Sequence, residues 1–368
     1  MPPAPPRRRA LGAQRHAAGA LSTINILTPR RRESRARGVR DYDAVMLALL
    51  PLLLGAPLLA DARLLNEHPF VMAHDAATTY LDGGVVVHWA KTQGDGGFSK
   101  LLNCGARAFD TRPALNKKGA LVFHHGSVLI EHDLGDALDE IVSWSNSRGP
   151  NATSDDLILL STWDCAGGDA CNAATRTALA ERNITLIDDC GALAKLTVDE
   201  AFARAALPGG GAALAVWGCL ADHYDESVAC SGFGSKGQAR GAASTAASAA
   251  ATVGGSGLEY TCYNDSSSKA FPLDRMWDYL GNVSAAGPPA DGTLWSHQAL
   301  WQETDASVAV GVLHGSSLLL DEERSGLNAL LAQRLESGAW AASSGLNLVE
   351  VNHVCDGGER LRQAILAH

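Results

Sequence analysis

Short apolar runs, each long enough for one buried strand, recur along the chain from residue 69 onward. They predict strands at Pro69–Ala73, Ala106–Asp110, Ala120–Phe123, Leu157–Ser161, Ala212–Trp217, Leu294–Trp301 and Leu346–Val351. Helical spacing of apolar residues lies between several of these runs, at residues 134–142, Ser317–Leu335 and Glu359–Leu366. Strands that alternate with helices form a parallel sheet with the helices outside it. The pattern therefore predicts an α/β fold, a (β/α)8-type TIM barrel of regular or irregular form.

Two glycine-rich stretches interrupt this alternation. Gly209-Gly210-Gly211 predicts a flexible joint, and Ser235–Gly257 is rich in Ala, Ser and Gly. The composition of the second stretch suits either a poorly packed helix or a loop, so we attach no chemistry to it.

Residues 1–62 differ from the rest of the chain. The first forty contain Arg7–Arg9 and Arg30–Arg32, no acidic residue before Glu33, and no apolar period. Ala44–Leu59 is strongly apolar and is followed by Ala60-Asp61-Ala62, a small-x-small site typical of signal-peptide cleavage. We therefore expect residues 1–62 to be a basic leader plus signal peptide, and residues 63–368 to form the barrel. An organelle transit peptide and an uncleaved anchor are the competing interpretations, and translation from Met46 would remove the basic stretch.

All eight cysteines lie beyond residue 62, and no two are spaced C-x-x-C, which argues against a zinc site. They are Cys104, Cys165, Cys171, Cys190, Cys219, Cys230, Cys262 and Cys355. An even number favours disulfides in an oxidising compartment, with buried free thiols as the alternative. N-glycosylation sequons lie at Asn151, Asn183, Asn264 and Asn282. We therefore expect a secreted, disulfide-bonded glycoprotein.

The charge is unevenly divided between the two parts. Ten of the 30 basic and four of the 40 acidic residues fall in residues 1–62, so the remainder has a formal net charge of −16. Such an acidic domain is a poor partner for nucleic acid and for anionic membranes. Any phosphate must therefore be bound by local basic residues.

Polar side chains gather at the predicted carboxyl ends of three strands. The first strand ends in Ala73-His74-Asp75, the second in Asp110-Thr111-Arg112 and the third in His124-His125-Gly126. The carboxyl ends of barrel strands meet at one rim, where the functional site of this fold lies. We therefore expect two histidines, two acids and an arginine at that rim.

This combination suits the cleavage of a phosphodiester. One histidine can remove a proton from an attacking hydroxyl and the other can protonate the leaving oxygen. An arginine fork can hold two phosphate oxygens, and carboxylates can orient the imidazoles. A single histidine near a strand end is more often structural, so the prediction depends on the whole set.

The chain resembles the bacterial phosphatidylinositol-specific phospholipases C at three motifs. MAHDAATTYL at residues 72–81 is similar to their G-T-H-D-S-G-T, GARAFDTR at 105–112 to G-A-R-x-F-D-x-R, and LVFHHG at 121–126 to V-L-H-H-G. Trp89 and Thr92-Gln93 lie where the family has W-x-x-T-Q. The similarity covers about Pro69–Ser161, and beyond it only spaced strands support the relation.

The resemblance implies a role for each catalytic candidate. His74 matches the general base that deprotonates the inositol 2-hydroxyl, and His125 matches the general acid for the diacylglycerol leaving group. Asp75 matches the acidic partner of that acid, Arg112 the phosphate-binding arginine, and Asp110 the acid two residues before it. His124 is expected to be structural. Calcium-dependent relatives have an acidic residue at the position of Arg112, so the resemblance implies the metal-independent branch, with no metal and no cofactor.

Two positions depart from the family pattern. Trp163 stands where bacterial members have a lysine, and Asn352 stands roughly where an aspartate orients the base, with Asp356 the nearest carboxylate. We expect Trp163 and Asn352 to contact the substrate, with weakened recognition of inositol.

Three hypotheses follow. The first is a monomeric phospholipase C-type enzyme that cleaves a phosphoinositide or a related phospholipid at a membrane surface. The second is a phosphodiesterase of the same barrel with a non-inositol headgroup. The third is a catalytically silent protein that binds lipids or the glycan of glycosylphosphatidylinositol anchors.

Overall fold

The computed structural model describes residues 62–153, 156–163, 165–221, 273–302, 315–340 and 345–367, together with residues 271, 308, 311 and 312. The expected leader and signal peptide, except Ala62, and the Ser235–Gly257 stretch lie outside the described residues.

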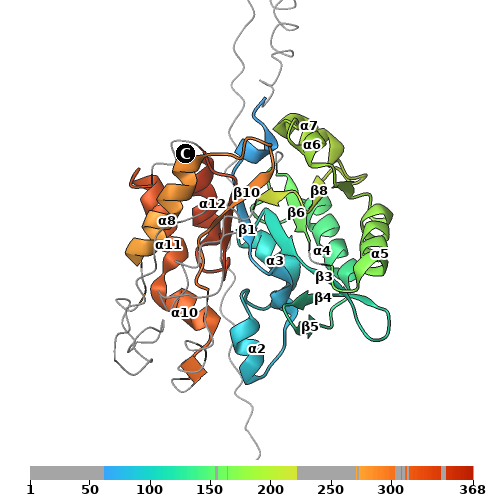
Figure 1. Ribbon diagram of the computed structural model, residues 1–368, viewed down its shortest axis with the longest axis horizontal. Helices are drawn as coiled ribbons and strands as arrows, with labels where there is room; N and C mark the ends of the chain where they lie inside the picture. Colours follow the sequence, from blue (N-terminus) through green and yellow to red (C-terminus); the bar gives the residue numbers. More distant parts are fainter. Residues whose placement is uncertain are drawn as a thin grey trace, which may run out of the picture. The chain divides into compact units, whose positions relative to one another are not determined.

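Eight strands form one curled sheet in which every neighbouring pair is parallel (Figure 1). In order across the sheet they are β7 (Thr185–Ile187), β8 (Ala213–Trp217), β6 (Ile158–Thr162), β2 (Ala108–Thr111), β1 (Phe70–Ala73), β11 (Leu348–Val351), β10 (Leu294–Gln298) and β9 (Leu220–Ala221). Six of the seven strands predicted from the sequence belong to this sheet. The predicted α/β barrel class is confirmed.

The barrel is irregular at the junction of β8 and β9. Only Gly218 and Cys219 separate these two strands in the chain. Gly218 N–H donates to Thr162 of β6 at 3.2 Å, whereas Cys219 C=O accepts from Leu294 of β10 at 3.0 Å. One continuous stretch of chain thus contains both the second strand of the order, β8, and the last, β9, and the sheet curls round on itself. Gly218 has a φ of 68°, which favours glycine at this bend.

The third predicted strand lies elsewhere, which corrects the sequence interpretation. β3 (Pro113–Leu115), β4 (Leu121–His125) and β5 (Val128–Ile130) form a separate antiparallel sheet. The reason is the turn between β3 and β4, where the Asn116 side chain accepts from the N–H groups of Lys118 and Ala120 at 2.9 Å. Such an Asx turn reverses the chain into a hairpin. β4 therefore lies outside the eight-stranded sheet.

The helices lie outside the sheet and cover it (Figure 1). They are α2 (Val85–Ala90), α3 (Gly97–Asn103), α4 (Leu134–Ser147), α5 (Gly168–Glu181), α6 (Cys190–Leu193), α7 (Val198–Arg204), α8 (Leu273–Ala286), α10 (Leu318–Ser325), α11 (Leu327–Glu336) and α12 (Gly358–Leu366), with 3-10 turns η2 (Leu65–Glu67) and η3 (Ala76–Tyr80). The pattern expected over Ser317–Leu335 is two helices, because Gly326 adopts the left-handed conformation at φ 59°. Within the described ranges, no helix is long and apolar enough to cross a membrane.

The interior face of the barrel changes from apolar to polar along three neighbouring strands, β2, β1 and β11. Phe70 and Met72 of β1 belong to the interior apolar cluster, and His74 follows them on the same face. The same change occurs from Ala108 to Asp110 in β2 and from Leu348 to Glu350 in β11, the two strands that pair with β1. The carboxyl ends of the strands therefore carry the polar groups, as the sequence predicts.

The prediction of disulfides is confirmed for the described cysteines. The bonds are Cys104–Cys355, Cys165–Cys171 and Cys190–Cys219. Cys230 and Cys262 lie outside the described residues. The first bond joins α3 to the segment that follows β11, across 251 residues.

Candidate active site

Asp75 stands at the centre of the polar rim. Its side chain is almost fully buried, and its backbone has the left-handed φ of 43°, an unusual conformation for a residue other than glycine. The carboxylate Oδ1 lies 2.9 Å from the Arg112 guanidinium. Oδ2 lies 3.2 Å from Nε2 of His74 and 3.1 Å from Nε2 of His125. One carboxylate therefore gathers the arginine and both histidines, although they come from two different sheets.

His74 has a fixed tautomer. Its Nδ1 lies 2.8 Å from Oδ1 of Asn352. The amide nitrogen of Asn352 donates to the backbone oxygen of Trp301 at 3.1 Å and to Oε1 of Glu322 at 2.7 Å. Because the amide nitrogen is used there, Asn352 presents its oxygen to His74, and His74 Nδ1–H is the donor. Nε2 of His74 is thus the nitrogen that faces the rim.

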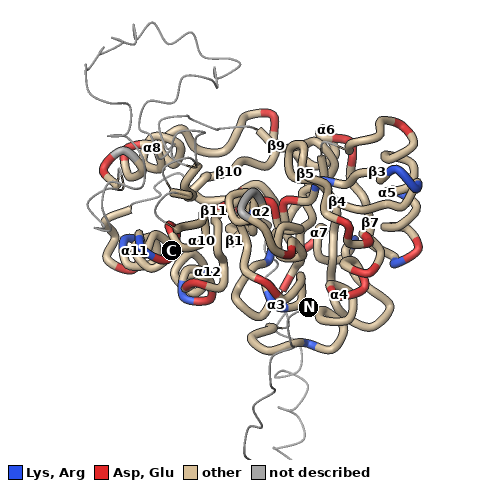
Figure 2. The backbone as a smooth tube through the Cα atoms, turned by 90° about the horizontal axis from the view of Figure 1, so that it is seen from below, with Lys and Arg blue, Asp and Glu red and all other residues tan. Residues whose placement is uncertain are grey.

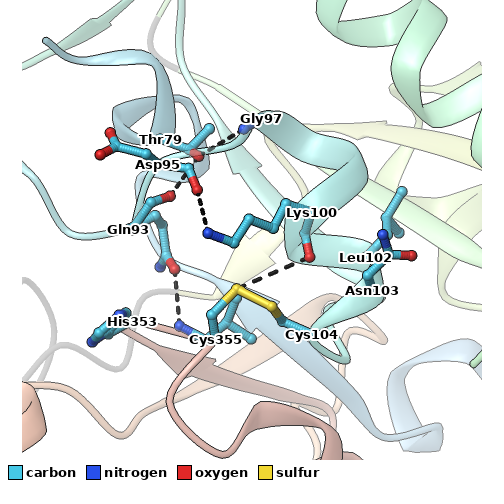
Figure 3. Close-up of a disulfide and its surroundings, with 12 residues drawn as sticks. Thr79, Gln93, Asp95, Gly97, Lys100, Leu102, Asn103, Cys104, His353 and Cys355 are labelled. Carbon is cyan, nitrogen blue, oxygen red and sulfur yellow. Dashed lines mark hydrogen bonds between the residues drawn. A yellow bond between two sulfur atoms is a disulfide. The ribbon is translucent and has the colours of Figure 1, made fainter. Parts of the chain in front are cut away.

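The segment that carries Asn352 is anchored from two sides (Figure 3). The Gln93 amide donates to the backbone oxygens of His74 and Val351 and accepts from Val354 N–H, at 2.9 to 3.0 Å. The disulfide from Cys355 to Cys104 holds the same segment against α3. These contacts fix the end of β11 beside the end of β1, which keeps Asn352 against His74.

His125 is oriented by the backbone. Its Nδ1 donates to the carbonyl oxygen of Ala90 at 2.8 Å, so that Nε2 points to Asp75. Its neighbour His124 turns the other way, with Nδ1 3.1 Å from the oxygen of Gly126. His125 lines the rim cavity and His124 is not among the residues that do so.

Arg112 is held between two acids and an indole ring. It lies 2.8 Å from Oδ2 of Asp110, and its guanidinium stacks 4.3 Å from the centre of the Trp163 ring. Trp163 Nε1–H in turn donates to Oδ1 of Asp110 at 2.6 Å. The indole of Trp163, at the position where the bacterial family has a lysine, therefore positions Arg112 and Asp110. The single N–H of the indole is used in this contact.

The two histidines have opposite pKa shifts. Burial lowers the pKa of His74, but the negative charges of Asp75 and Glu350 outweigh burial, so the pKa is raised overall. Burial lowers the pKa of His125, and the attraction of Asp75 does not restore it because His74 and Arg112 oppose a further positive charge. The free site thus favours a proton on His74 and a neutral His125. Asp110 has a lowered pKa: burial raises it, and Arg112 more than offsets this.

A cavity of about 510 Å³ opens at this rim. It is lined by Met72, His74, Asp75, Arg112, His125, Trp163, Gly218, Leu220, Ala221, Ser296, Gln298, Gln302 and Glu350. Arg112 is the only lysine or arginine among the described residues that line the cavity. Asn352 lies behind His74 and is not part of it. The cavity therefore offers one cationic clamp, two imidazoles and a floor of hydroxyl, amide and carboxylate groups.

His74, Asp110 and Glu350 could be considered as metal ligands, because one ligand atom of each lies within 4.8 Å of the others. The hydrogen-bond donors around Asp110 do not suit a bound cation. Asp110 accepts from Trp163, from Arg112 and from Asp75 N–H. The guanidinium of Arg112 would also repel a metal ion placed beside Asp110. The set is better suited to hold an arginine than a divalent ion.

The sequence missed two acids of this region. Glu350 lies on the interior face two residues before Asn352, and strand alternation could have found it. Glu322 lies on α10, 30 residues from Asn352, and no local pattern connects them. Asp356, considered as a partner for the base, has a backbone bond to His353, whereas the bond to His74 comes from Asn352.

No protein-family model matches the chain. Over 95 residues it is 34% identical to 1-phosphatidylinositol phosphodiesterase of Staphylococcus aureus strain Newman, and equally to that of strain NCTC 8325 / PS 47. The match covers 26% of this chain and 30% of the first relative. The resemblance read from the motifs is confirmed. The chain thus spans less than a third of the length of the curated relatives that it matches.

The fold comparison covers more of the chain. A solved structure of the phosphatidylinositol-specific phospholipase C of Staphylococcus aureus, studied for its membrane binding, superposes with a TM-score of 0.50 at 16% identity. It covers 82% of this chain and 95% of that protein. At this identity the likeness shows the fold alone, and it agrees with the irregular parallel barrel described above.

Proposed function

We propose that the protein is a phospholipase C-type phosphodiesterase that cleaves a phosphatidylinositol-like lipid without a metal ion. The observation that carries this proposal is the convergence of Arg112 and the Nε2 atoms of His74 and His125 on Asp75, each within 3.2 Å. This cluster opens into a cavity large enough for a headgroup. The sequence similarity to 1-phosphatidylinositol phosphodiesterases supports the same reaction class.

In the proposed reaction the headgroup hydroxyl next to the phosphate attacks phosphorus. Nε2 of His74 takes the hydroxyl proton, and Arg112 holds the phosphate oxygens as negative charge develops on them. The bond from phosphorus to the diacylglycerol oxygen breaks, and His125 gives that oxygen its proton. Asp75 stabilises the imidazolium of His125 and, together with Asp110, holds Arg112. The products are a cyclic phosphodiester and diacylglycerol.

Substrate binding supplies the protonation states that this reaction needs. At the start of the reaction His74 must be neutral and His125 must be protonated. The pKa shifts in the free site favour the opposite states. A phosphate anion held by Arg112 beside His125 raises the pKa of that histidine, because opposite charges favour its protonated form. Displacement of the Asp75 contact to His74 by a substrate hydroxyl removes the main attraction that holds the proton on His74.

The headgroup is proposed to be a polyol without additional phosphates. Glu350 is buried beside the cavity, and burial raises the pKa of its carboxyl. Ser296 donates to its Oε2 at 2.7 Å, and Gln298 and Gln302 complete this side. These groups suit hydroxyls. A ring phosphate would meet Glu350 with no lysine or arginine other than Arg112 in the described lining to neutralise it.

We expect phosphatidylinositol to be cleaved at least ten times faster than phosphatidylinositol 4-phosphate, measured as kcat/KM in mixed micelles. The Glu350→Gln variant should narrow this ratio, because the amide keeps a hydrogen-bonding group and removes the charge. Equal rates for both lipids in the unaltered protein would contradict the polyol assignment. Preference among unphosphorylated headgroups should be weak, since the indole N–H of Trp163 is bonded to Asp110 instead of the headgroup.

We expect full activity after treatment with EDTA and removal of the chelator by dialysis. Arg112 supplies the positive charge that a metal would otherwise bring to the phosphate. The measurement compares initial rates before treatment, after treatment and after addition of Ca²⁺. Loss of activity with EDTA and its return with Ca²⁺ would show that the site uses a metal.

The protein is proposed to be a secreted monomer that meets its lipid at a membrane surface. The three disulfides and the exposed sequon residues Asn151, Asn183 and Asn282 support an extracellular location. Acidic positions are spread along the described backbone, whereas basic ones are few and scattered, so charge alone does not attract anionic lipid (Figure 2).

We expect the purified secreted protein to begin near Arg63 and to lose mass on enzymatic deglycosylation. N-terminal sequencing, thiol titration under denaturing conditions and mass spectrometry test this. A protein with all eight cysteines reduced, or one that retains residues 1–62, would contradict the proposed secretion.

A silent lipid-binding protein remains the contrasting hypothesis. Assays with phosphatidylinositol, lysophosphatidylinositol and glycerophosphodiesters separate the three hypotheses. Cleavage of the first two supports the proposal, cleavage of the last alone indicates a different headgroup, and binding without turnover indicates a silent protein.

A further inference from the structure

Glu322 is a buried acid that the reaction described above does not use. It lies on α10 with only 2% of its surface exposed. Its Oε1 accepts from Trp301 N–H at 3.0 Å and from the Asn352 amide at 2.7 Å. Its Oε2 is buried without a hydrogen-bond partner among the described residues. A carboxyl group that costs free energy to bury is therefore placed directly behind the side chain that contacts His74.

The contacts form a chain of three side chains. Nδ1–H of His74 donates to Oδ1 of Asn352 at 2.8 Å, and Nδ2–H of Asn352 donates to Oε1 of Glu322 at 2.7 Å. All three side chains are buried. These hydrogen bonds thus connect the base His74, through the neutral amide of Asn352, to the acid Glu322.

The direction of the amide decides the tautomer of His74. If Asn352 were rotated by half a turn, its oxygen would face both Glu322 Oε1 and the Trp301 oxygen, and its nitrogen would face His74. His74 would then have to accept at Nδ1, which places the proton on Nε2. A neutral histidine in that form has no lone pair at Nε2 and cannot take a proton from a substrate hydroxyl.

We propose that Glu322 is a positioning residue for the base: by accepting from Asn352, it fixes the amide so that Nε2 of His74 is free to accept a proton. The inference rests on the proposed function. It also accounts for the absence of an aspartate at position 352, since the carboxyl group lies one side chain farther from the histidine.

Electrostatics support the same arrangement. Burial raises the pKa of Glu322 to about 8, while the positive charge of His74 lowers it and Asp321 on the same helix raises it. A proton on His74 and the ionised form of Glu322 therefore stabilise each other. Oε1 can accept from Asn352 in both protonation states of the carboxyl group, so the orientation does not depend on that ionisation.

The test is a double-mutant cycle of Glu322→Gln and Asn352→Asp in the full chain. Glutamine can donate as well as accept, so in E322Q only the Trp301 oxygen still opposes the flipped amide. E322Q should lower kcat for phosphatidylinositol about ten-fold, the effect of about one hydrogen bond. KM and the melting temperature should change little. Aspartate at position 352 has no donor and can only accept from His74. In that background E322Q should cost less than three-fold, because the glutamine can donate to the new carboxylate.

Equal losses from E322Q in both backgrounds would indicate a purely structural role and overturn the proposal, as would an E322Q variant with unchanged kcat. A second readout does not need turnover. The ¹⁵N shifts of the His74 ring at high pH should show the Nδ1–H tautomer in the unaltered protein and a mixture in E322Q. The same tautomer in both proteins would refute the positioning role even if the lipid substrate is wrong. An inactive protein with the expected tautomers would instead refute the proposed function alone.

Discussion

Replacement of either rim histidine by alanine should lower kcat for phosphatidylinositol by about 10²–10⁴, the range of one general acid or base. In the proposed reaction, His74→Ala removes the acceptor for the hydroxyl proton, and His125→Ala removes the donor for the leaving oxygen. Both side chains lie at the surface of the cavity, so the fold should persist. Steady-state rates and melting temperatures of the two variants measure this directly.

The two roles can be separated by the leaving group. A substrate with a nitrophenolate leaving group needs little protonation, because nitrophenolate is a stable anion. His125→Ala should therefore regain much of its rate on that substrate, whereas His74→Ala should not. His124→Ala is the matched control, since this neighbour on β4 bonds to Gly126 and is not among the residues that line the cavity. If His125→Ala were fully active on the lipid, another group would have to be the acid.

The sequence predicted most of the sheet because each strand carries its own signal. Phe70–Ala73 is an unbroken apolar run that is buried on both faces, and this run alone predicts a strand with His74 at its polar end. The error at β4 has an equally local cause. Asn116 and Gly119 form the turn that makes a hairpin, and the apolar run after this turn does not by itself distinguish a hairpin strand from a barrel strand.

The candidate site was predictable only where its members lie at or directly after the ends of predicted strands. His74, Asp75, Asp110 and Arg112 lie on adjacent strands, and the contact between His125 and Asp75 agrees with their grouping at one rim. The link from Asn352 to Glu322 depends on how α10 packs against the end of β11, which no local pattern encodes. The hydrogen bond from Trp163 to Asp110, across the neighbouring strands β6 and β2, likewise depends on tertiary packing and not on a local pattern.

Replacement of Arg112 by lysine should lower kcat by about 10²–10³, although the positive charge is kept, because this is the effect of losing one well-placed donor to a developing oxyanion. The planar guanidinium contacts Asp75 with one nitrogen and Asp110 with the other, and its face stacks on Trp163. A lysine ammonium has no plane to stack and no fork to bridge two acids. It would leave at least one of the two buried carboxylates without its contact to the cation.

The pH dependence of the Arg112→Lys variant shows whether the geometry of the guanidinium matters or its positive charge alone is sufficient. Asp110 owes its lowered pKa to Arg112, which outweighs the effect of burial. In Arg112→Lys the weaker contact should raise that pKa, and activity should fall at a higher pH on the acid side than in the unaltered protein. Trp163→Phe is the informative companion: it keeps the ring under Arg112 and removes only the N–H to Asp110. It should show a smaller acid-side shift and a smaller loss of kcat, because Arg112 stays beside Asp110 and one hydrogen bond to the carboxylate is lost. An Arg112→Lys variant with full activity and an unshifted profile would mean that a point charge is sufficient, and that the two-acid clamp around the guanidinium has no part in catalysis.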